Sequence, residues 1–259
     1  MKGDMQMSAS KFFDRVDDML SEVRTKQMGN IRKAAQYMAS SIAADRWVLL
    51  FGTSHSHTPA AETFPRTGSM VGFYPIPELP LSITHGSGEM GIPQMLFLET
   101  REGYAQAVLQ NYDLDPRDTM VLFSQSGING VIIDMALEAK RKGLKVIAIT
   151  SLAHTMASSS RHSSGKRLCE VADVVIDNCV PDGDALLKLD GLDQLVGPGS
   201  TISSVAIIDA LICEVAANLL EAGITPLVNV TFNKSDDFDG PKHMEKVIQE
   251  YRRKLRTLL

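Results

Sequence analysis

Apolar residues in the first part of the chain recur at intervals of three and four positions. Between residues 8 and 44 they are Phe12, Val16, Met19, Leu20, Val23, Ile31, Ala34, Ala35, Met38 and Ile42. This spacing puts the apolar side chains on one face of a helix. Gly29 and Asn30 interrupt the pattern, so we predict one long helix or two helices that meet near this point. The apolar face is expected to pack on the core or on another subunit.

The middle of the chain alternates between short apolar runs and helical patterns. The apolar runs cover residues 48–51, 70–74, 120–123, 145–150 and 173–177, and the helical patterns cover 57–66, 101–111 and 131–142. This alternation is typical of an α/β protein, in which a parallel sheet carries helices on both faces. Farther along we expect a long helix over 201–222, a last strand or extended arm over 226–232, and a terminal helix over 241–259.

One segment fits neither pattern. Residues 75–94 contain four prolines and three glycines and show no clear periodicity. A long irregular segment inside a compact domain often carries function, so we expect an active-site loop or a subunit contact here. The chain as a whole is predicted to consist of an N-terminal helical segment (1–45), one α/β domain (46–222), and a C-terminal arm and helix (223–259).

Composition narrows the classes of protein and partner. The 259 residues carry a net charge of −5 and no unbalanced basic cluster, which argues against nucleic-acid binding. The three cysteines are far apart in the sequence, as expected for reduced thiols rather than disulfides. The N-terminus lacks the apolar core of a signal peptide, and no uncharged stretch has the length of a membrane span. We therefore expect a cytoplasmic protein with no nucleic-acid or membrane partner.

The most informative chemistry lies where the run 120–123 ends. The residues that follow are Ser124, Gln125, Ser126 and Gly127, with Asn129 just before the next helical pattern. A strand that turns into a helix through small and hydroxyl-bearing residues offers side-chain donors beside the free N–H groups of the first helical turn. Such a site holds an anion without lysine or arginine. The alternative is that Ser126 or Asn129 only caps the helix.

A second turn of the same kind follows the run 48–51. It contains Gly52, Thr53, Ser54, His55 and Ser56, and the next helix is expected to begin at Ser56. In an open parallel sheet the carboxyl ends of the strands share one edge, where ligands bind. The two turns are therefore predicted to hold one phosphate group from two sides. A third turn, at Ser200 and Thr201, opens the long helix over 201–222, either as a ligand contact or as a simple cap.

With these turns the chain resembles the sugar isomerase (SIS) domain family of phosphosugar-binding proteins, over about residues 46–222. The resemblance rests on the two turns, on residues 146–150 and 171–177, and on two further segments, 161–168 and 183–187. It implies a three-layer αβα sandwich with a five-stranded, flavodoxin-like parallel sheet. It also implies a homodimer or homotetramer with the site at a subunit interface, and a phosphorylated sugar as ligand.

The resemblance also assigns residues to the ligand. Ser56, Ser124, Ser126 and Asn129 would bind the phosphate. The full set of expected substrate-binding residues is Gly52, Thr53, Ser54, His55, Ser56, Ser124, Gln125, Ser126, Gly127, Asn129, Ser200 and Thr201. One departure stands out, because the family pattern has a second glycine where this chain has Ser54. A side chain there narrows the approach to the ligand or requires a different backbone angle.

Aldose–ketose isomerisation, the activity that the resemblance favours, needs a carboxylate base and an acid–base group for the oxygens. Glu62 is the expected base, with a solvent-exposed ion pair to Arg66 as the alternative. His57 and His85 are the preferred histidines. His55 and His162 are further candidates, and Asp184 stays undecided.

No metal or cofactor is expected. Zinc-dependent phosphoheptose isomerases of this family carry a histidine at the position of Thr58, and the predicted helix 201–222 contains none. Two other functions use the same phosphate site. One is a lyase or etherase acting on an amino-sugar phosphate, which shares the proton abstraction. The other is a phosphosugar sensor without catalysis, a role that in transcriptional regulators goes with an added DNA-binding domain.

Overall fold

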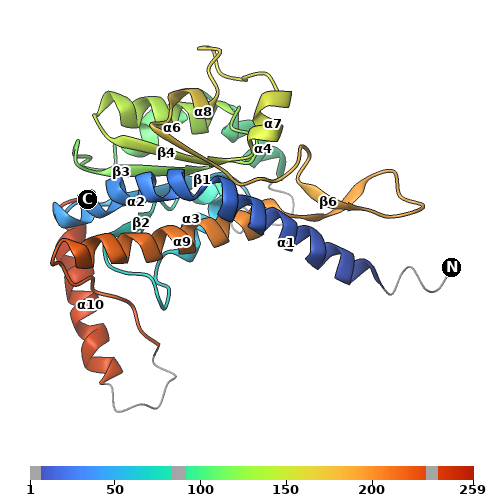
Figure 1. The fold of residues 1–259 in the computed structure, drawn as a ribbon. Coiled ribbons are helices and arrows are strands. Elements are labelled where there is room, and N and C mark those ends of the chain that lie inside the picture. Colours follow the sequence, from blue (N-terminus) through green and yellow to red (C-terminus); the bar gives the residue numbers. More distant parts are fainter. Residues whose placement is uncertain (1–6, 83–91, 232–238) are drawn as a thin grey trace.

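The computed structural model describes residues 7–82, 92–231 and 239–259 (Figure 1). A five-stranded parallel sheet forms the centre, with strand order β2-β1-β3-β4-β5. The strands are β1 (Val48–Gly52), β2 (Phe73–Pro75), β3 (Thr119–Phe123), β4 (Lys145–Thr150) and β5 (Val174–Asp177). Val48 lies opposite Phe73 on one side and Thr119 on the other. This is the flavodoxin-like order, and it confirms the predicted fold class.

The central strands are apolar throughout because both faces of the sheet are covered. Successive side chains of β1 alternate between two hydrophobic clusters, with Leu49 and Phe51 in one and Val48 and Leu50 in the other. All four of these side chains are fully buried. A parallel sheet covered on both faces thus explains why the sequence shows continuous apolar runs here instead of an apolar–polar alternation.

One face of the sheet is covered by the N-terminal helices and the long late helix. These are α1 (Ser8–Lys26), α2 (Met28–Ala43), the short α3 (His57–Glu62) and α9 (Ser200–Glu221). The predicted helical break exists, but it lies at Gln27, two residues before Gly29. By length and composition α9 could span a membrane. In this fold its apolar residues pack against α2 and the sheet.

The remaining helices lie mainly over the other face and at the ends of the sheet (Figure 1). They are η2 (Leu79–Leu81), α4 (Ile92–Glu99), α5 (Tyr104–Leu109), α6 (Gly130–Arg141), α7 (Leu152–Ala157), α8 (Leu168–Val171) and α10 (Gly240–Leu255). The hydrophobic cluster that contains Leu49 and Phe51 joins α5, α6 and α10 to this face. Residues 226–231 run extended beside residues 69–71, with a single bridge between Met70 and Val228.

Several elements differ from the prediction. Helix α3 ends at Glu62 instead of residue 66, because Pro65 removes a backbone donor and disfavours helical geometry before it. Helix α4 was not predicted, since it begins inside the proline- and glycine-rich segment. The antiparallel hairpin of β6 (Ala185–Lys188) and β7 (Leu195–Pro198) was not predicted either. Helix α4 and the hairpin both contribute to the cavity described next.

Candidate functional site

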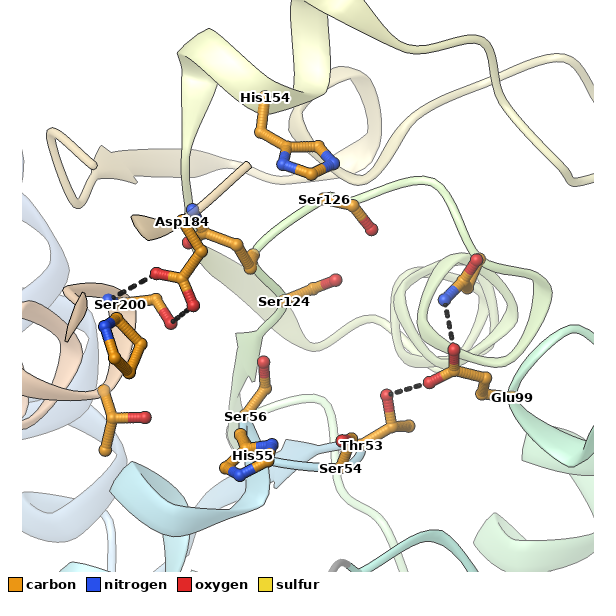
Figure 2. Close-up of a pocket in the computed structure, with 14 residues that line it drawn as sticks. Thr53, Ser54, His55, Ser56, Glu99, Ser124, Ser126, His154, Asp184 and Ser200 are labelled. Atoms are coloured by element: carbon orange, nitrogen blue, oxygen red, sulfur yellow. Dashed lines mark hydrogen bonds between the residues drawn. The ribbon is translucent and has the colours of Figure 1, made fainter. Parts of the chain in front are cut away.

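A cavity of about 310 Å³ opens at the carboxyl ends of β1 and β3. This is the point where the strand order reverses, the usual ligand site of a doubly wound sheet. The lining residues are Thr53, Ser54, His55, Ser56, Glu99, Ser124, Gln125, Ser126, Asn129, His154, Asp184, Pro198, Ser200 and Thr201. The structure therefore brings both predicted turns and the start of α9 to one place (Figure 2).

The turn of residues 52–56 is shaped by a close backbone approach. A Cβ atom on Gly52 would lie 2.1 Å from the carbonyl oxygen of Ser56, so only glycine fits at the end of β1. Ser54 adopts a left-handed conformation with φ of 56°, which glycine accepts more readily than serine. Its N–H donates to the carbonyl of Leu81 at 2.7 Å, which ties the turn to η2. The serine thus keeps the backbone angle expected of a glycine and adds a side chain to the cavity wall.

The turn of residues 124–129 is held by its own side chains. Ser124 Oγ accepts a hydrogen bond from the Gly127 N–H at 3.0 Å. Gly127 has φ of 63°, and a Cβ there would lie 3.1 Å from the hydroxyls of Thr150 and Thr155. Asn129 occupies the N-cap position of α6, but its side chain makes no capping hydrogen bond. The simple capping role left open for Asn129 is therefore wrong, and its amide has another partner.

That partner is Glu99, which the sequence reasoning did not identify. Asn129 Nδ2 donates to Glu99 Oε1 at 2.9 Å, and Thr53 Oγ1 donates to Oε2 at 3.1 Å. Glu99 is only 8 % exposed, at the end of α4. A glutamate directly after the apolar residues 95–98 is the one sequence signal that could have marked it.

The pKa of the Glu99 carboxyl is raised above its usual value. Burial is the largest cause, because it penalises the charged form. The hydrogen bonds from Thr53 and Asn129 and the positive charge of Arg161 oppose this shift of the pKa. A buried carboxyl with a raised pKa in a cavity is a candidate for proton transfer.

The opposite side of the cavity is formed at the start of α9. Asp184 Oδ1 accepts hydrogen bonds from the N–H groups of Gly199 at 3.2 Å and Ser200 at 2.8 Å, and Oδ2 accepts from Ser200 Oγ at 3.0 Å. Figure 2 shows Asp184 and Ser200 on one side of the cavity and Glu99 on the other. The first turn of α9 already holds a carboxylate, so Ser200 and Thr201 line the cavity at an occupied helix start.

His154 and Gln125 complete the polar lining. His154 Nδ1 lies 3.3 Å from the Gly183 N–H and 3.3 Å from Asp182 Oδ1. Gln125 Oε1 accepts a hydrogen bond from buried Asn178 at 2.8 Å, which fixes the amide. Within the described part of the chain, Gln125 Nε2 is buried and has no hydrogen-bond partner, which leaves it as a donor.

Two of the three predicted catalytic residues, Glu62 and His57, do not line this cavity. Glu62 pairs with Arg66, with Oε1 2.5 Å from Nε, and does not line the cavity. His57 is partly buried at the start of α3 and also lies outside the lining. His85 lies outside the described residues. Their catalytic roles stay predictions. Over the described ranges, no group of three His, Cys, Asp or Glu side chains gathers closely enough to hold a metal ion.

Comparisons with known proteins agree with this architecture. The SIS domain family model matches residues 11–151. A UPF0309 protein of Thermoanaerobacter pseudethanolicus is 33 % identical over 252 residues, covering 96 % of this chain and 99 % of that protein. The phosphoheptose isomerase GmhA of Neisseria gonorrhoeae superposes with a TM-score of 0.53 at 15 % identity, over 82 % of this chain and 99 % of its own. The sugar isomerase domain of an RpiR transcription factor of Sphaerobacter thermophilus gives 0.51 at 17 %, over 95 % and 99 %. At these identities, both structures show the likeness of the fold alone.

Proposed function

The chain belongs to the SIS domain family, and on that premise we propose that its cavity binds a phosphorylated sugar and isomerises it. The observation that carries this proposal is the position of buried Glu99 at the cavity wall, hydrogen-bonded to residues from both turns. A phosphate-binding turn (here residues 124–129) beside a carboxylate base is the arrangement that an aldose–ketose isomerase requires.

Electrostatics favours the turn 124–129 as the site of the phosphate. This turn ends at the start of α6, a helix of 12 residues whose first-turn N–H groups carry a partial positive charge. Ser124, Gln125 and Ser126 line the same cavity, and Ser56 adds a hydroxyl from the other turn. The start of α9 is the weaker choice, because Asp184 already neutralises it.

Glu99 then acts as the base. Its carboxylate takes the proton from the carbon next to the sugar carbonyl, and the C–H electron pair forms the double bond of an enediolate. Return of the proton to the neighbouring carbon completes the exchange of aldose for ketose. Since this step needs the charged form, the raised pKa brings Glu99 closer to the proton affinity of the reacting carbon.

The oxygens of the sugar need a second proton carrier. His154 and His55 both line the cavity, whereas His57 does not. His154 is the better placed of the two, because the Gly183 N–H donates to its Nδ1 and orients the ring. We therefore assign His154 this role, in place of the histidines that the sequence favoured.

The lyase or etherase shares the first step with the isomerase, and a sensor would use the phosphate-binding turn alone.

The test is a thermal-shift panel of aldose and ketose phosphates against the unphosphorylated sugars, with NMR analysis of each ligand after incubation. A ligand that binds the native state raises the unfolding temperature by mass action. Phosphate-dependent stabilisation with conversion to the isomer supports the proposal. Elimination products indicate the lyase, a ligand recovered unchanged indicates the sensor, and equal shifts with and without phosphate contradict the site.

A further inference from the structure

The segment of residues 161–168 (Arg-His-Ser-Ser-Gly-Lys-Arg-Leu), here called the arginine loop, is fastened to the turn 124–129 at both ends. The N–H of Arg161 donates to the carbonyl of Ile128 at 2.9 Å, and the N–H of Leu168 donates to the carbonyl of Gly127 at 2.8 Å. These bonds join the loop to backbone atoms of the turn 124–129, the proposed phosphate site. The loop and the turn therefore form one unit.

His162, the residue after Arg161, anchors the loop to α6. The His162 side chain is only 6 % exposed, and its Nε2 lies 2.9 Å from Oδ1 of buried Asp134 on α6. Its Nδ1 lies 2.8 Å from Ser164 Oγ. Ser163 adds a bond from its N–H to Glu102 at 2.6 Å. With these contacts the backbone of Arg161 is fixed, while its side chain stays exposed.

The side chain of Arg161 reaches the rim of the cavity. Its Nη1 donates to Asn129 Oδ1 at 3.1 Å, and Asn129 lines the cavity. The same Asn129 amide donates to Glu99 on its other side. None of the described lining residues is a lysine or an arginine. A phosphate ligand with about two negative charges would thus meet neutral donors in the cavity and one arginine beside them.

We propose that Arg161 binds the phosphate of the ligand by leaving the neutral oxygen of Asn129 for a phosphate oxygen. The inference rests on the proposed phosphosugar function and adds a residue that this function did not use. A guanidinium forms shorter and stronger hydrogen bonds with an anion than with a neutral amide oxygen, so the exchange favours the ligand. Because the loop is fixed at the turn, only side-chain rotation is needed.

The experiment compares wild type with Arg161→Met and with the matched control Lys166→Met. Lys166 is an exposed cation of the same loop, and its side chain has no assigned part in the site. Dissociation constants are measured for glucose 6-phosphate, fructose 6-phosphate and inorganic phosphate, and for the two unphosphorylated sugars. We expect Arg161→Met to weaken binding of the phosphates about 10- to 100-fold, the range for one charge-assisted hydrogen bond, and to leave the free sugars unchanged. Lys166→Met should change any of these constants less than 3-fold.

A second measurement follows the side chain directly. The Arg161 Nε–H signal, identified by its loss in Arg161→Lys, should shift as inorganic phosphate is added to the wild type. Binding of phosphates that is unchanged in Arg161→Met, with a stationary Nε–H signal, overturns the inference but leaves the proposed function standing. A wild type that none of the phosphates binds contradicts the proposed function and the inference together. Equal weakening in both Met variants would mean a diffuse charge effect, and would also overturn the role of Arg161.

Discussion

Two helices begin at the same cavity, and their first turns differ in charge. At the start of α9, the Asp184 carboxylate accepts hydrogen bonds from two backbone N–H groups and from Ser200. At the start of α6, the N-cap residue is neutral Asn129, whose amide turns away from the helix to Glu99. A carboxylate at a helix start stabilises the helix by about 0.3–1 kcal/mol. Because Asp184 already makes this interaction, the start of α9 attracts a second anion less strongly. Similar hydroxyl-bearing sequences thus begin one helix with a neutral N-cap residue and the other with a bound carboxylate.

The largest expected effect is on turnover. Glu99→Gln keeps an acceptor for Thr53 but cannot take a proton, so the rate constant should fall by about 10²- to 10⁴-fold with little change in sugar-phosphate affinity. Glu62→Gln tests the competing assignment from the sequence and should change turnover less than about 3-fold, because Glu62 pairs with Arg66. Steady-state kinetics of the two variants separate the assignments, and the reverse order of effects would return the role to Glu62.

The pH dependence gives the next largest effect. The base must be charged, and burial raises the pKa of Glu99 above 4.5, so turnover should fall about 10-fold per pH unit below that raised pKa. Arg161 opposes the rise in pKa, so Arg161→Met should move the acidic limb to still higher pH. The raised pKa also makes the free energy of unfolding depend on pH. Relative to Glu99→Gln, the wild type should lose stability as the pH rises from 4.5 past the raised pKa of Glu99. An acidic limb below pH 4.5 contradicts this assignment.

Binding should separate the two helix starts. Ser124→Ala with Ser126→Ala removes two hydroxyls beside α6 and should weaken binding of sugar phosphates about 10- to 100-fold. Some stability should be lost as well, about 1 kcal/mol, because Gly127 loses its acceptor on Ser124. Ser200→Ala at the other helix start should change the dissociation constant less than 3-fold. Calorimetric titration of both variants decides, and a stronger effect of Ser200→Ala would put the phosphate at α9.

The smallest expected effect comes from the cap itself. Asp184→Asn removes the negative charge at the start of α9 and should lower the free energy of unfolding by about 1 kcal/mol. The same change removes a repulsive charge from the cavity wall, so phosphate should bind about 2- to 5-fold more tightly, as a screened charge interaction allows. Chemical denaturation and phosphate titration of the variant provide both values. Weaker binding would show that Asp184 itself holds the ligand.

The turns were predictable because their chemistry is local. A buried strand followed by glycine, serine and a helix indicates an anion site, and parallel strands bring such turns to one edge. For Ser54 the sequence left open a narrower approach to the ligand or a different backbone angle. In the structure Ser54 keeps a left-handed angle, and its side chain lines the cavity. The sequence left two interpretations of Glu62 open, because its helical spacing is equally suited to an ion pair with Arg66, four residues on. That ion pair forms in the structure, and the catalytic role stays a prediction.

Glu99 and Asp184 were harder to predict, because their surroundings come from distant segments. Glu99 is buried only after α4 reaches Thr53 and Asn129, which lie 46 and 30 residues away in the sequence. Asp184 caps α9 from 16 residues upstream because the β6–β7 hairpin returns the chain to it. Tertiary contacts of this kind leave little periodicity in the sequence, so composition and spacing do not reveal them.

We propose that phosphate binds at the start of α6 and not at the start of α9. The most direct measurement is an amide NMR titration of the wild-type protein with inorganic phosphate, repeated with the sugar phosphate that stabilises it most. We expect the largest shifts at the N–H groups of residues 126–131 and small shifts at residues 199–203. The largest shifts at residues 199–203, with the turn 124–129 unchanged, would contradict it.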